Sequence, residues 1–231
     1  MTEQGVVAVI PAKDEAQRLG ATLAALARVP QVSAVIVVDD GSRDRTAVIA
    51  EQTGVLVCRH TRNQGKAAAM QTGAQAAGER HPGAALLFVD ADLADSAAGL
   101  GVLCDPVLAG EADMTIAVLP PQDRAGGGFG FVVRPARDGI RELTGWEAAQ
   151  PLSGMRCLTR DAFDAATPLA RGWGVEVGLT IDVLRSGGRV LEVPCALRHR
   201  VTGRGWRAQV HRARQYRDVR RALGARRRLG S

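Results

Sequence analysis

The chain has 231 residues, enough for one large α/β domain with a buried core or for two small domains. Hydrophobic residues make up 46% of it and aromatic residues only 3%, so the core must consist mostly of Ala, Val and Leu. No apolar run approaches the roughly 18 residues of a membrane-spanning helix. The N-terminus also lacks the basic and long apolar regions of a signal peptide, so we expect a cytoplasmic protein.

Strands and helices alternate in the first half of the sequence. Strand-like apolar runs occupy residues 6–10, 34–38, 55–58, 85–89 and 114–118. Helical spacing of apolar residues occurs in 16–28, 43–53, 66–78 and 97–108. This order predicts a mostly parallel sheet with right-handed crossovers and with helices on both faces.

The second half is less regular. The Gly-rich stretch 120–131 indicates a mobile loop that could act as a flap over a site, since it has no phosphate-loop pattern. Helices are expected near 134–144 and 175–185, and a strand at 189–194. No repeat or linker divides the chain, which favours one domain with a C-terminal subdomain.

The positive charge is concentrated near the C-terminus. Residues 198–228 contain twelve arginines and a single acid, Asp218, although the whole chain has a net charge of only +6. The preferred interpretation is an amphipathic helix over 205–223 that packs on the domain through its apolar side. The alternative is contact with an anionic membrane surface or another polyanion.

The four cysteines are widely spaced and include no Cys-x-x-Cys pair. They are Cys58, Cys104, Cys157 and Cys195. This pattern favours reduced and mostly buried side chains over a disulfide framework or a cysteine metal site.

Three polar segments directly follow predicted strands: "PAKDE" at 11–15, "DDGS" at 39–42 and "DAD" at 90–92. Because the carboxyl ends of parallel strands meet at one edge of a sheet, these segments should line one cleft. Carboxylates repel phosphates unless a divalent cation bridges them, and Mg²⁺ and Mn²⁺ are typically held by one or two carboxylates plus phosphate oxygens. The sequence lacks the glycine motifs of dinucleotide and P-loop sites.

Individual residues in these segments suggest distinct tasks. Asp90 and Asp92 are two positions apart, so one can reach a metal while the other holds a ribose or a water molecule. Asp40 or Glu15 can accept hydrogen bonds from a base or a ribose hydroxyl. Lys66 begins a helix, where its charge and the helix N-terminus can both serve a diphosphate.

In their order and spacing, "VIPAKDE", "VVDDGSRDRT", "NQGKAAAM" and "FVDADL" resemble the nucleotide-sugar-binding half of glycosyltransferases with the GT-A fold, in family two and its relatives. This resemblance covers residues 6–95. The later segments "PLSG", "RGWGVEVGLTIDVL" and "RHR" are similar to the glucosyl-3-phosphoglycerate synthase branch and extend it to about residue 203. The resemblance implies one Rossmann-like, mostly parallel sheet. It also implies a nucleotide-sugar half at 1–118, an acceptor-side half at 119–203 and a basic helix and tail at 204–231.

The resemblance also implies roles for particular residues. The residues implied for the nucleotide are Pro11, Ala12, Glu15, Asp40, Lys66, Asp90 and Ala91. Those implied for the sugar and acceptor are Leu152, Ser153, Gly154, Trp173, Gly174 and Glu176, of which Glu176 is the catalytic candidate. The implied cofactor is a divalent cation, Mn²⁺ or Mg²⁺, held by Asp92 and His199, and the imidazole ligand favours Mn²⁺.

Two of these residues also have simpler interpretations. Glu176 lies in an apolar run, where an uncompensated polar group costs ~2–7 kcal/mol, so it needs a partner. Sugar hydroxyls could be this partner. The simpler interpretation is that Glu176 is a carboxylate at a helix start that pairs with an arginine. His199 is flanked by arginines, and from the residues alone the favoured interpretation is a surface base; the resemblance favours the metal ligand.

The resulting prediction is a metal-dependent glycosyltransferase of the hexosyltransferase class that uses a nucleoside-diphosphate sugar, with UDP favoured. We expect no nucleic acid partner, an unidentified acceptor with a phosphate or carboxylate group, and peripheral membrane contact and a homodimer as further options. The branch has an asparagine where this chain has Val201, and no acid stands out as an inverting base, so acceptor and stereochemistry stay open.

Two rival functions remain. A sugar-phosphate nucleotidyltransferase shares the sheet and metal chemistry but normally has a GxGxR…K loop after the first strand, which "IPAKDEAQRLG" lacks. A non-catalytic module that binds nucleotides or membranes would rely on the arginine-rich tail.

Overall fold

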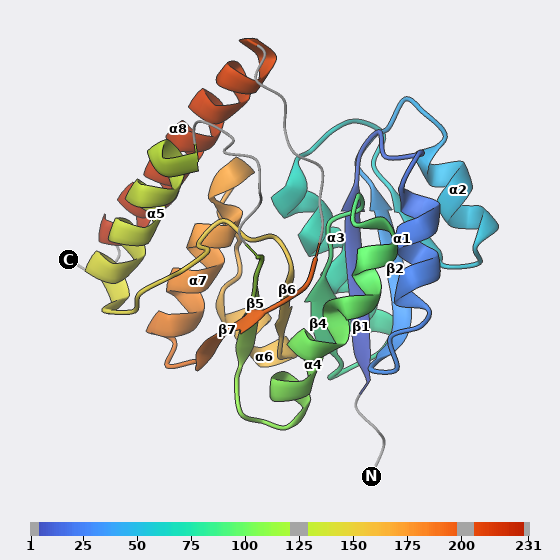
Figure 1. The fold of residues 1–231 in the computed structure, drawn as a ribbon, viewed down its shortest axis with the longest axis horizontal. Helices are drawn as coiled ribbons and strands as arrows, with labels where there is room; N and C mark the ends of the chain where they lie inside the picture. Colours follow the sequence, from blue (N-terminus) through green and yellow to red (C-terminus); the bar gives the residue numbers. More distant parts are fainter. Residues whose placement is uncertain (1–4, 121–128, 198–205, 229–231) are drawn as a thin grey trace.

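The computed structural model describes residues 5–120, 129–197 and 206–228 (Figure 1). Within these ranges seven strands form one sheet in the order β3-β2-β1-β4-β6-β5-β7. The strands are β1 Val6–Ala12, β2 Val32–Asp39, β3 Leu56–Arg59, β4 Ala85–Phe88, β5 Met114–Val118, β6 Arg156–Leu158 and β7 Val190–Pro194. The helices are α1 Leu19–Leu26, α2 Thr46–Gln52, α3 Lys66–Arg80, α4 Gly101–Leu108, α5 Phe129–Thr144, α6 Arg160–Ala165, α7 Val175–Arg185 and α8 Trp206–Arg228, with 3₁₀ turns η1 Ala94–Leu100 and η2 Gly172–Gly174.

The sheet is mostly parallel, as predicted. Strands β1 to β4 pair in parallel, and so do β5 and β7, whereas β6 runs antiparallel to both β4 and β5. The β1–β2 and β1–β4 pairings carry the turns after these strands to the same edge of the sheet. The polar segments that follow β1, β2 and β4 therefore meet there.

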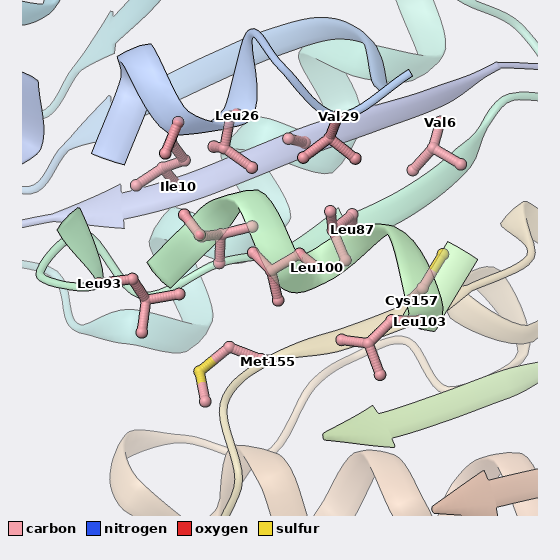
Figure 2. Close-up of a cluster of buried hydrophobic side chains, with 14 of the residues drawn as sticks. Val6, Ile10, Leu26, Val29, Leu87, Leu93, Leu100, Leu103, Met155 and Cys157 are labelled. Carbon is pink, nitrogen blue, oxygen red and sulfur yellow. The ribbon is translucent and has the colours of Figure 1, made fainter. Parts of the chain in front are cut away.

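Helices cover both faces of the sheet. On one face α1, η1 and α4 bury Leu26, Leu100 and Leu103 against Leu87 of β4 (Figure 2). On the other face α3, α6 and α7 cover the sheet with a second cluster that includes Met70. Two-sided burial explains why the central strands β1 and β4 are apolar throughout rather than alternating, because each fully buried Val or Leu side chain contributes about 1.5–3 kcal/mol.

A third cluster joins α7 to α5 and α8, and these last two helices lie at the end of the molecule beyond β7 (Figure 1). Val219 and Leu223 of α8 are buried in it together with Ile140 of α5 and Ile181 of α7. The interpretation of the C-terminal arginine-rich segment as a packed amphipathic helix is confirmed for the described part of α8.

Several element boundaries differ from the predictions. Helix α1 is shorter than 16–28, and the helix expected at 97–108 is split into η1 and α4. Helix α5 begins at Phe129, inside the stretch predicted as a flap, while residues 121–128 lie outside the described ranges. The three residues of β6 and the six of α6 were not predicted, because runs this short carry no readable periodicity.

All four cysteines are free thiols, and three of them are buried, as expected. Burial raises the pKa of the Cys195 thiol to about 11, so it is uncharged at neutral pH. Among the helices of the described residues, none combines the length and apolar character that a bilayer crossing requires.

Candidate active site

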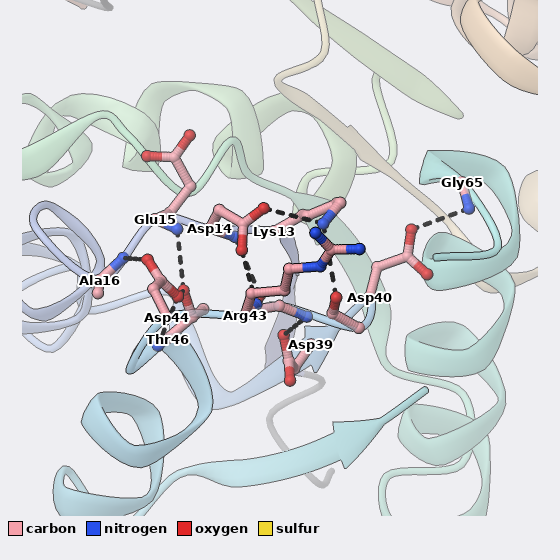
Figure 3. A network of polar contacts seen from close by, with 12 residues as sticks. Lys13, Asp14, Glu15, Ala16, Asp39, Asp40, Arg43, Asp44, Thr46 and Gly65 are labelled. Atoms are coloured by element: carbon pink, nitrogen blue, oxygen red, sulfur yellow. Dashed lines mark hydrogen bonds and ion pairs between the residues drawn. The ribbon is translucent and has the colours of Figure 1, made fainter. Parts of the chain in front are cut away.

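The turns after β1 and β2 are held together by carboxylates that bind backbone amides (Figure 3). Asp14 accepts hydrogen bonds from the Arg43 amide at 2.7 Å and from Lys13 Nζ at 2.9 Å, and the Arg43 bond is the main cause of its lowered pKa. Asp44 accepts one from the Ala16 amide at 3.1 Å. We call residues 11–16, 39–46 and 60–65 the turn network.

Asp40 ties this network to the start of α3. Its side chain is only 7% exposed, and it accepts hydrogen bonds from the amides of Gln64 at 2.7 Å and Gly65 at 2.8 Å. His60 Nδ1 lies 2.8 Å from the same carboxylate. Because these contacts fix the segment immediately before Lys66, Asp40 sets the position at which α3 begins. Its predicted contact with the nucleotide stays a prediction.

An ion-paired cluster lies at the centre of the site and comes from three separate elements. Lys66 Nζ is 2.9 Å from Asp90 Oδ1, after β4, and 3.0 Å from Glu176 Oε1, in the first turn of α7. Burial alone would lower the pKa of Lys66, but Asp90 and then Glu176 outweigh it and raise the pKa above its usual value. We call Lys66, Asp90 and Glu176 the ionic triad. The partner that Glu176 needs is thus a lysine rather than the arginine considered from the sequence.

The "PLSG" segment closes over the triad. A Cβ atom at Gly154 would lie 2.5 Å from Lys66 Nζ and 2.8 Å from Asp90 Oδ1, so a larger residue there would displace the end of one of these side chains. The neighbouring Ser153 hydroxyl is buried and has no hydrogen-bond partner within the described part of the chain. Leu152 is partly buried in the cluster formed by α5, α7 and α8.

Arg156 holds this segment in place through hydrogen bonds to its backbone. The sequence analysis did not identify this residue. Its side chain is essentially buried and donates hydrogen bonds to the Ser153 carbonyl at 2.8 Å, the Pro151 carbonyl at 3.2 Å and Thr180 Oγ1 at 2.7 Å. Burial lowers its pKa to about 10, against the opposing charges of Glu176 and Glu192. Arg156 therefore links the "PLSG" segment to α7. The one sequence feature that could have identified Arg156 is its charge within the otherwise apolar run "MRCL".

The "DAD" turn is anchored by α1. Thr22 Oγ1 donates a hydrogen bond to the Ala91 carbonyl at 2.9 Å, and Arg18 Nη1 lies 3.3 Å from the Asp92 carbonyl. The Asp92 side chain is thereby left partly exposed at the carboxyl end of β4. The described residues contain no cluster of three or more His, Cys, Asp or Glu side chains fit for a metal, and His199 lies outside them. Because Asp90 is paired with Lys66, Asp92 is the carboxylate of this turn that suits a cation taking its other ligands from phosphate and water.

The remaining predicted residues lie at the end of β1, in the turn that follows it, and in η2. Pro11 and Ala12 end β1, where the Ala12 carbonyl accepts a hydrogen bond from the Asp40 amide at 2.9 Å, and the Glu15 amide donates to Thr46 Oγ1 at 2.9 Å. Trp173 and Gly174 belong to η2, directly before α7, and 36% of the Trp173 surface is exposed.

A cavity of about 760 Å³ opens beside the turn network. It is lined by Lys13, Asp14, Asp39, Gly41, Ser42, Arg43 and residues 59–63. None of the residues predicted to bind the nucleotide is among the lining residues, although Asp40 lies between two of them. The cavity therefore borders the predicted nucleotide residues rather than containing them.

The sequence of residues 7–164 matches the model of the family described as Glycosyl transferase family 2. The chain belongs to this family. A glucosyl-3-phosphoglycerate synthase of Mycolicibacterium paratuberculosis is 28% identical over 75% of this chain and 58% of its own length. An uncharacterized protein of Methanocaldococcus jannaschii is 31% identical over 68% of this chain and 65% of its own. The chain thus spans less than two thirds of the length of these relatives.

Solved structures agree with this assignment. The glucosyl-3-phosphoglycerate synthase of Mycobacterium tuberculosis, crystallised with Mn²⁺, UDP and glucosyl-3-phosphoglycerate, superposes with a TM-score of 0.80 at 25% identity, over 96% of this chain and 80% of that one. Its complex with Mg²⁺ and UDP has the same TM-score, over 96% and 79%. The GT-A fold predicted for this chain and its relationship to the glucosyl-3-phosphoglycerate synthase branch are confirmed.

Proposed function

We propose that this protein is a metal-dependent hexosyltransferase that moves a sugar from a UDP-sugar to an acceptor bearing a phosphate or carboxylate group. The observation that carries the proposal is the ionic triad, in which three distant segments converge under Gly154 at the carboxyl edge of a family 2 sheet. The related enzyme of M. tuberculosis has been crystallised with UDP, Mn²⁺ or Mg²⁺, and phosphate-bearing small molecules, which supports the same ligand classes here.

On the nucleotide side, Pro11, Ala12, Glu15, Asp40 and Ala91 would hold the base and ribose. Lys66 would serve the diphosphate, because its ammonium stays protonated and stands at the N-terminus of a 15-residue helix. A divalent cation held by Asp92 and His199 would neutralise negative charge as the diphosphate leaves.

On the sugar side, Glu176 would accept hydrogen bonds from sugar hydroxyls and orient the acceptor hydroxyl. Its carboxylate is 7% exposed and held in place by Lys66, so little side-chain freedom is lost when a sugar binds. The buried Ser153 hydroxyl offers a further hydrogen bond beside the sugar, while Trp173 on η2 supplies an exposed ring.

The direct test is release of UDP from UDP-glucose in the presence of Mn²⁺ and a panel of acceptors, including phosphoglyceric acid, glycerol 3-phosphate and a lipid phosphate. We expect acceptor-dependent release that stops with excess chelator. Asp92→Ala should abolish turnover without unfolding the protein. Turnover by this variant at the original rate would contradict the proposed metal role.

The same assay addresses the rival functions. A nucleotidyltransferase would release pyrophosphate from UTP and a sugar phosphate, which membership of family 2 argues against. A non-catalytic module would bind UDP without turning over any donor. Cytoplasmic location and homodimer formation remain predictions from the sequence.

The exposed face of α8 is best suited to bind an anionic lipid surface as a peripheral partner. Arg214, Arg217, Arg220 and Arg221 are exposed along it, and Phe131 of α5, 76% exposed, has its ring centroid 5.6 Å from that of Tyr216. Cations beside an exposed aromatic ring favour an interface with anionic headgroups. Co-sedimentation with phosphatidylglycerol vesicles but not phosphatidylcholine vesicles, lost in Arg214→Glu/Arg220→Glu, would support the contact. Equal behaviour with both lipids would oppose it.

A further inference from the structure

Helix α8 packs very closely against the elements on the sugar side of the site, because glycines stand at the points of contact. Four glycines on three elements face it: Gly139 of α5, Gly172 and Gly174 of η2, and Gly178 of α7. A Cβ atom at Gly174 would lie 2.7 Å from both the Ala222 methyl carbon and the Asp218 carbonyl oxygen, and one at Gly172 would collide with the Asp218 carboxylate. Gly172 also has a φ of +63°, which favours glycine independently. The α8 backbone therefore approaches the η2 turn closely at Asp218 and Ala222.

Asp218 is the acid at the centre of this contact. Its side chain is 14% exposed, and its Oδ2 accepts a long hydrogen bond of 3.4 Å from the Trp173 amide. Its Oδ1 lies 3.3 Å from Arg217 Nε and 3.9 Å from Arg221 Nη1. Arginines of α8 therefore hold the carboxylate on one side while it touches the η2 turn on the other.

The η2 turn determines where Glu176 lies. Residues 172–174 run without interruption into α7, and Glu176 is the second residue of that helix. Glu176 reaches Lys66 over 3.0 Å, so a small displacement of the turn changes the geometry of the ionic triad. Because reacting groups must be held within fractions of an ångström, such displacements reduce turnover well before they unfold a protein.

We propose that Asp218 is a positioning residue for the reaction. It fixes the η2 turn, and through the turn it places Trp173 and Glu176 against the sugar and acceptor. This inference rests on the proposed function. It gives Asp218, the single acid among residues 198–228, a role at the contact between α8 and the η2 turn. Asp218 acts through the turn and does not itself touch the substrate.

The test compares Asp218→Ala and Asp218→Asn with a control that weakens α8 elsewhere. Asp182→Asn is suitable, because Asp182 of α7 pairs with Arg226 of α8 without touching η2. In Asp218→Ala we expect kcat to fall about tenfold while the calorimetric Kd for UDP with Mn²⁺ is unchanged. Asp218→Asn keeps an acceptor oxygen for the Trp173 amide, so its kcat should stay within about threefold of the original. Asp182→Asn should lower Tm more than Asp218→Ala but change kcat less.

A purely structural role predicts a different result, in which the loss of kcat follows the loss of Tm across all three variants, and this would overturn the proposal. Hydrogen exchange gives a readout that does not depend on activity. Amides of residues 172–176 should exchange faster in Asp218→Ala than in Asp182→Asn, and equal exchange in the two variants would also overturn it. Absence of turnover in the unsubstituted protein would count against the proposed function, whereas the exchange result would still decide whether Asp218 positions the turn.

Discussion

The turn network and the ionic triad are both built around carboxylates, yet they use these groups differently. In the network Asp14, Asp40 and Asp44 accept hydrogen bonds from backbone amides. In the triad Asp90 and Glu176 face the side chain of Lys66. A bond to a backbone amide is lost only when the chain moves, whereas a lysine ammonium can exchange one anionic partner for another. The network therefore forms a fixed wall, and the triad is the part that can respond to a ligand.

The comparison predicts that carboxylates of the two regions fail in different ways when substituted. Glu176→Gln should produce the largest effect on activity, a loss of about 10²–10³-fold in turnover, because the charge that orients the sugar is removed from a buried position. Its free energy of unfolding should change by less than about 1.5 kcal/mol, since Lys66 keeps Asp90. Donor turnover and urea unfolding measure the two quantities, with the exposed Glu147→Gln as the control. If the loss of stability in Glu176→Gln fully accounted for its loss of activity, the triad and the turn network would not differ in the way described.

Asp40→Ala should produce the largest effect on stability. Two amides and the His60 ring lose their acceptor at a site that is nearly buried, so we expect the free energy of unfolding to fall by about 2–4 kcal/mol. UDP binding should weaken as well, because the start of α3 is released. Urea unfolding of this variant beside Glu176→Gln gives the comparison directly. An unchanged unfolding midpoint would show that the Asp40 contacts are dispensable to the network.

Gly154→Ala tests the close packing above the triad. The added methyl group must displace Lys66 Nζ or Asp90, both of which are ends of side chains, so we expect about a tenfold loss of turnover with the fold retained. Gly224→Ala is a matched control, since a Cβ atom there meets nothing within 4 Å and lies within α8. This control should keep full activity and gain up to about 1 kcal/mol of stability. Equal activity of the two variants would contradict the packing described for Gly154.

The smallest expected effect is a pH dependence that comes from outside the triad. The Arg189 side chain, and then the Arg189 amide, lower the pKa of Asp113 below its usual 3.8. Because the folded-state pKa is the lower one, this pair contributes stability above pH 3.8 and loses it as the pH falls through the folded-state value. Asp113→Asn should therefore flatten the acid limb of the unfolding curve and leave neutral turnover unchanged. An unaltered acid limb would rule out this contribution.

The sequence predicted the parts of the molecule that depend on local pattern and on the topology that follows from it. Apolar runs located β1 to β5 and β7, and the convergence of strand ends placed the segments 11–15, 39–42 and 90–92 at one edge. Asp40 and Asp90 look alike in the sequence, since each follows a strand. Only the folded structure shows that the Asp40 carboxylate accepts hydrogen bonds from the backbone amides of Gln64 and Gly65.

Other features depend on contacts between distant segments, which no local pattern reveals. Arg156 bonds to Thr180, 24 positions away, and Asp218 meets Trp173 across 45 positions. The antiparallel strand β6 is too short to carry a signal, and it is recognisable only from its partners β4 and β5. Its omission from the prediction also hid the buried position of Arg156.

The most direct test of the account is calorimetric binding of UDP and GDP, each with Mn²⁺ and then with excess chelator, to the unsubstituted protein and to Glu176→Gln. We predict metal-dependent binding of UDP, weaker binding of GDP, and unchanged UDP affinity in Glu176→Gln, because that residue serves the sugar and not the nucleotide. A preference for GDP would keep the cleft but change the donor. Binding of neither nucleotide by a folded sample, or UDP binding that chelator leaves intact, would contradict a metal-dependent nucleotide-sugar site.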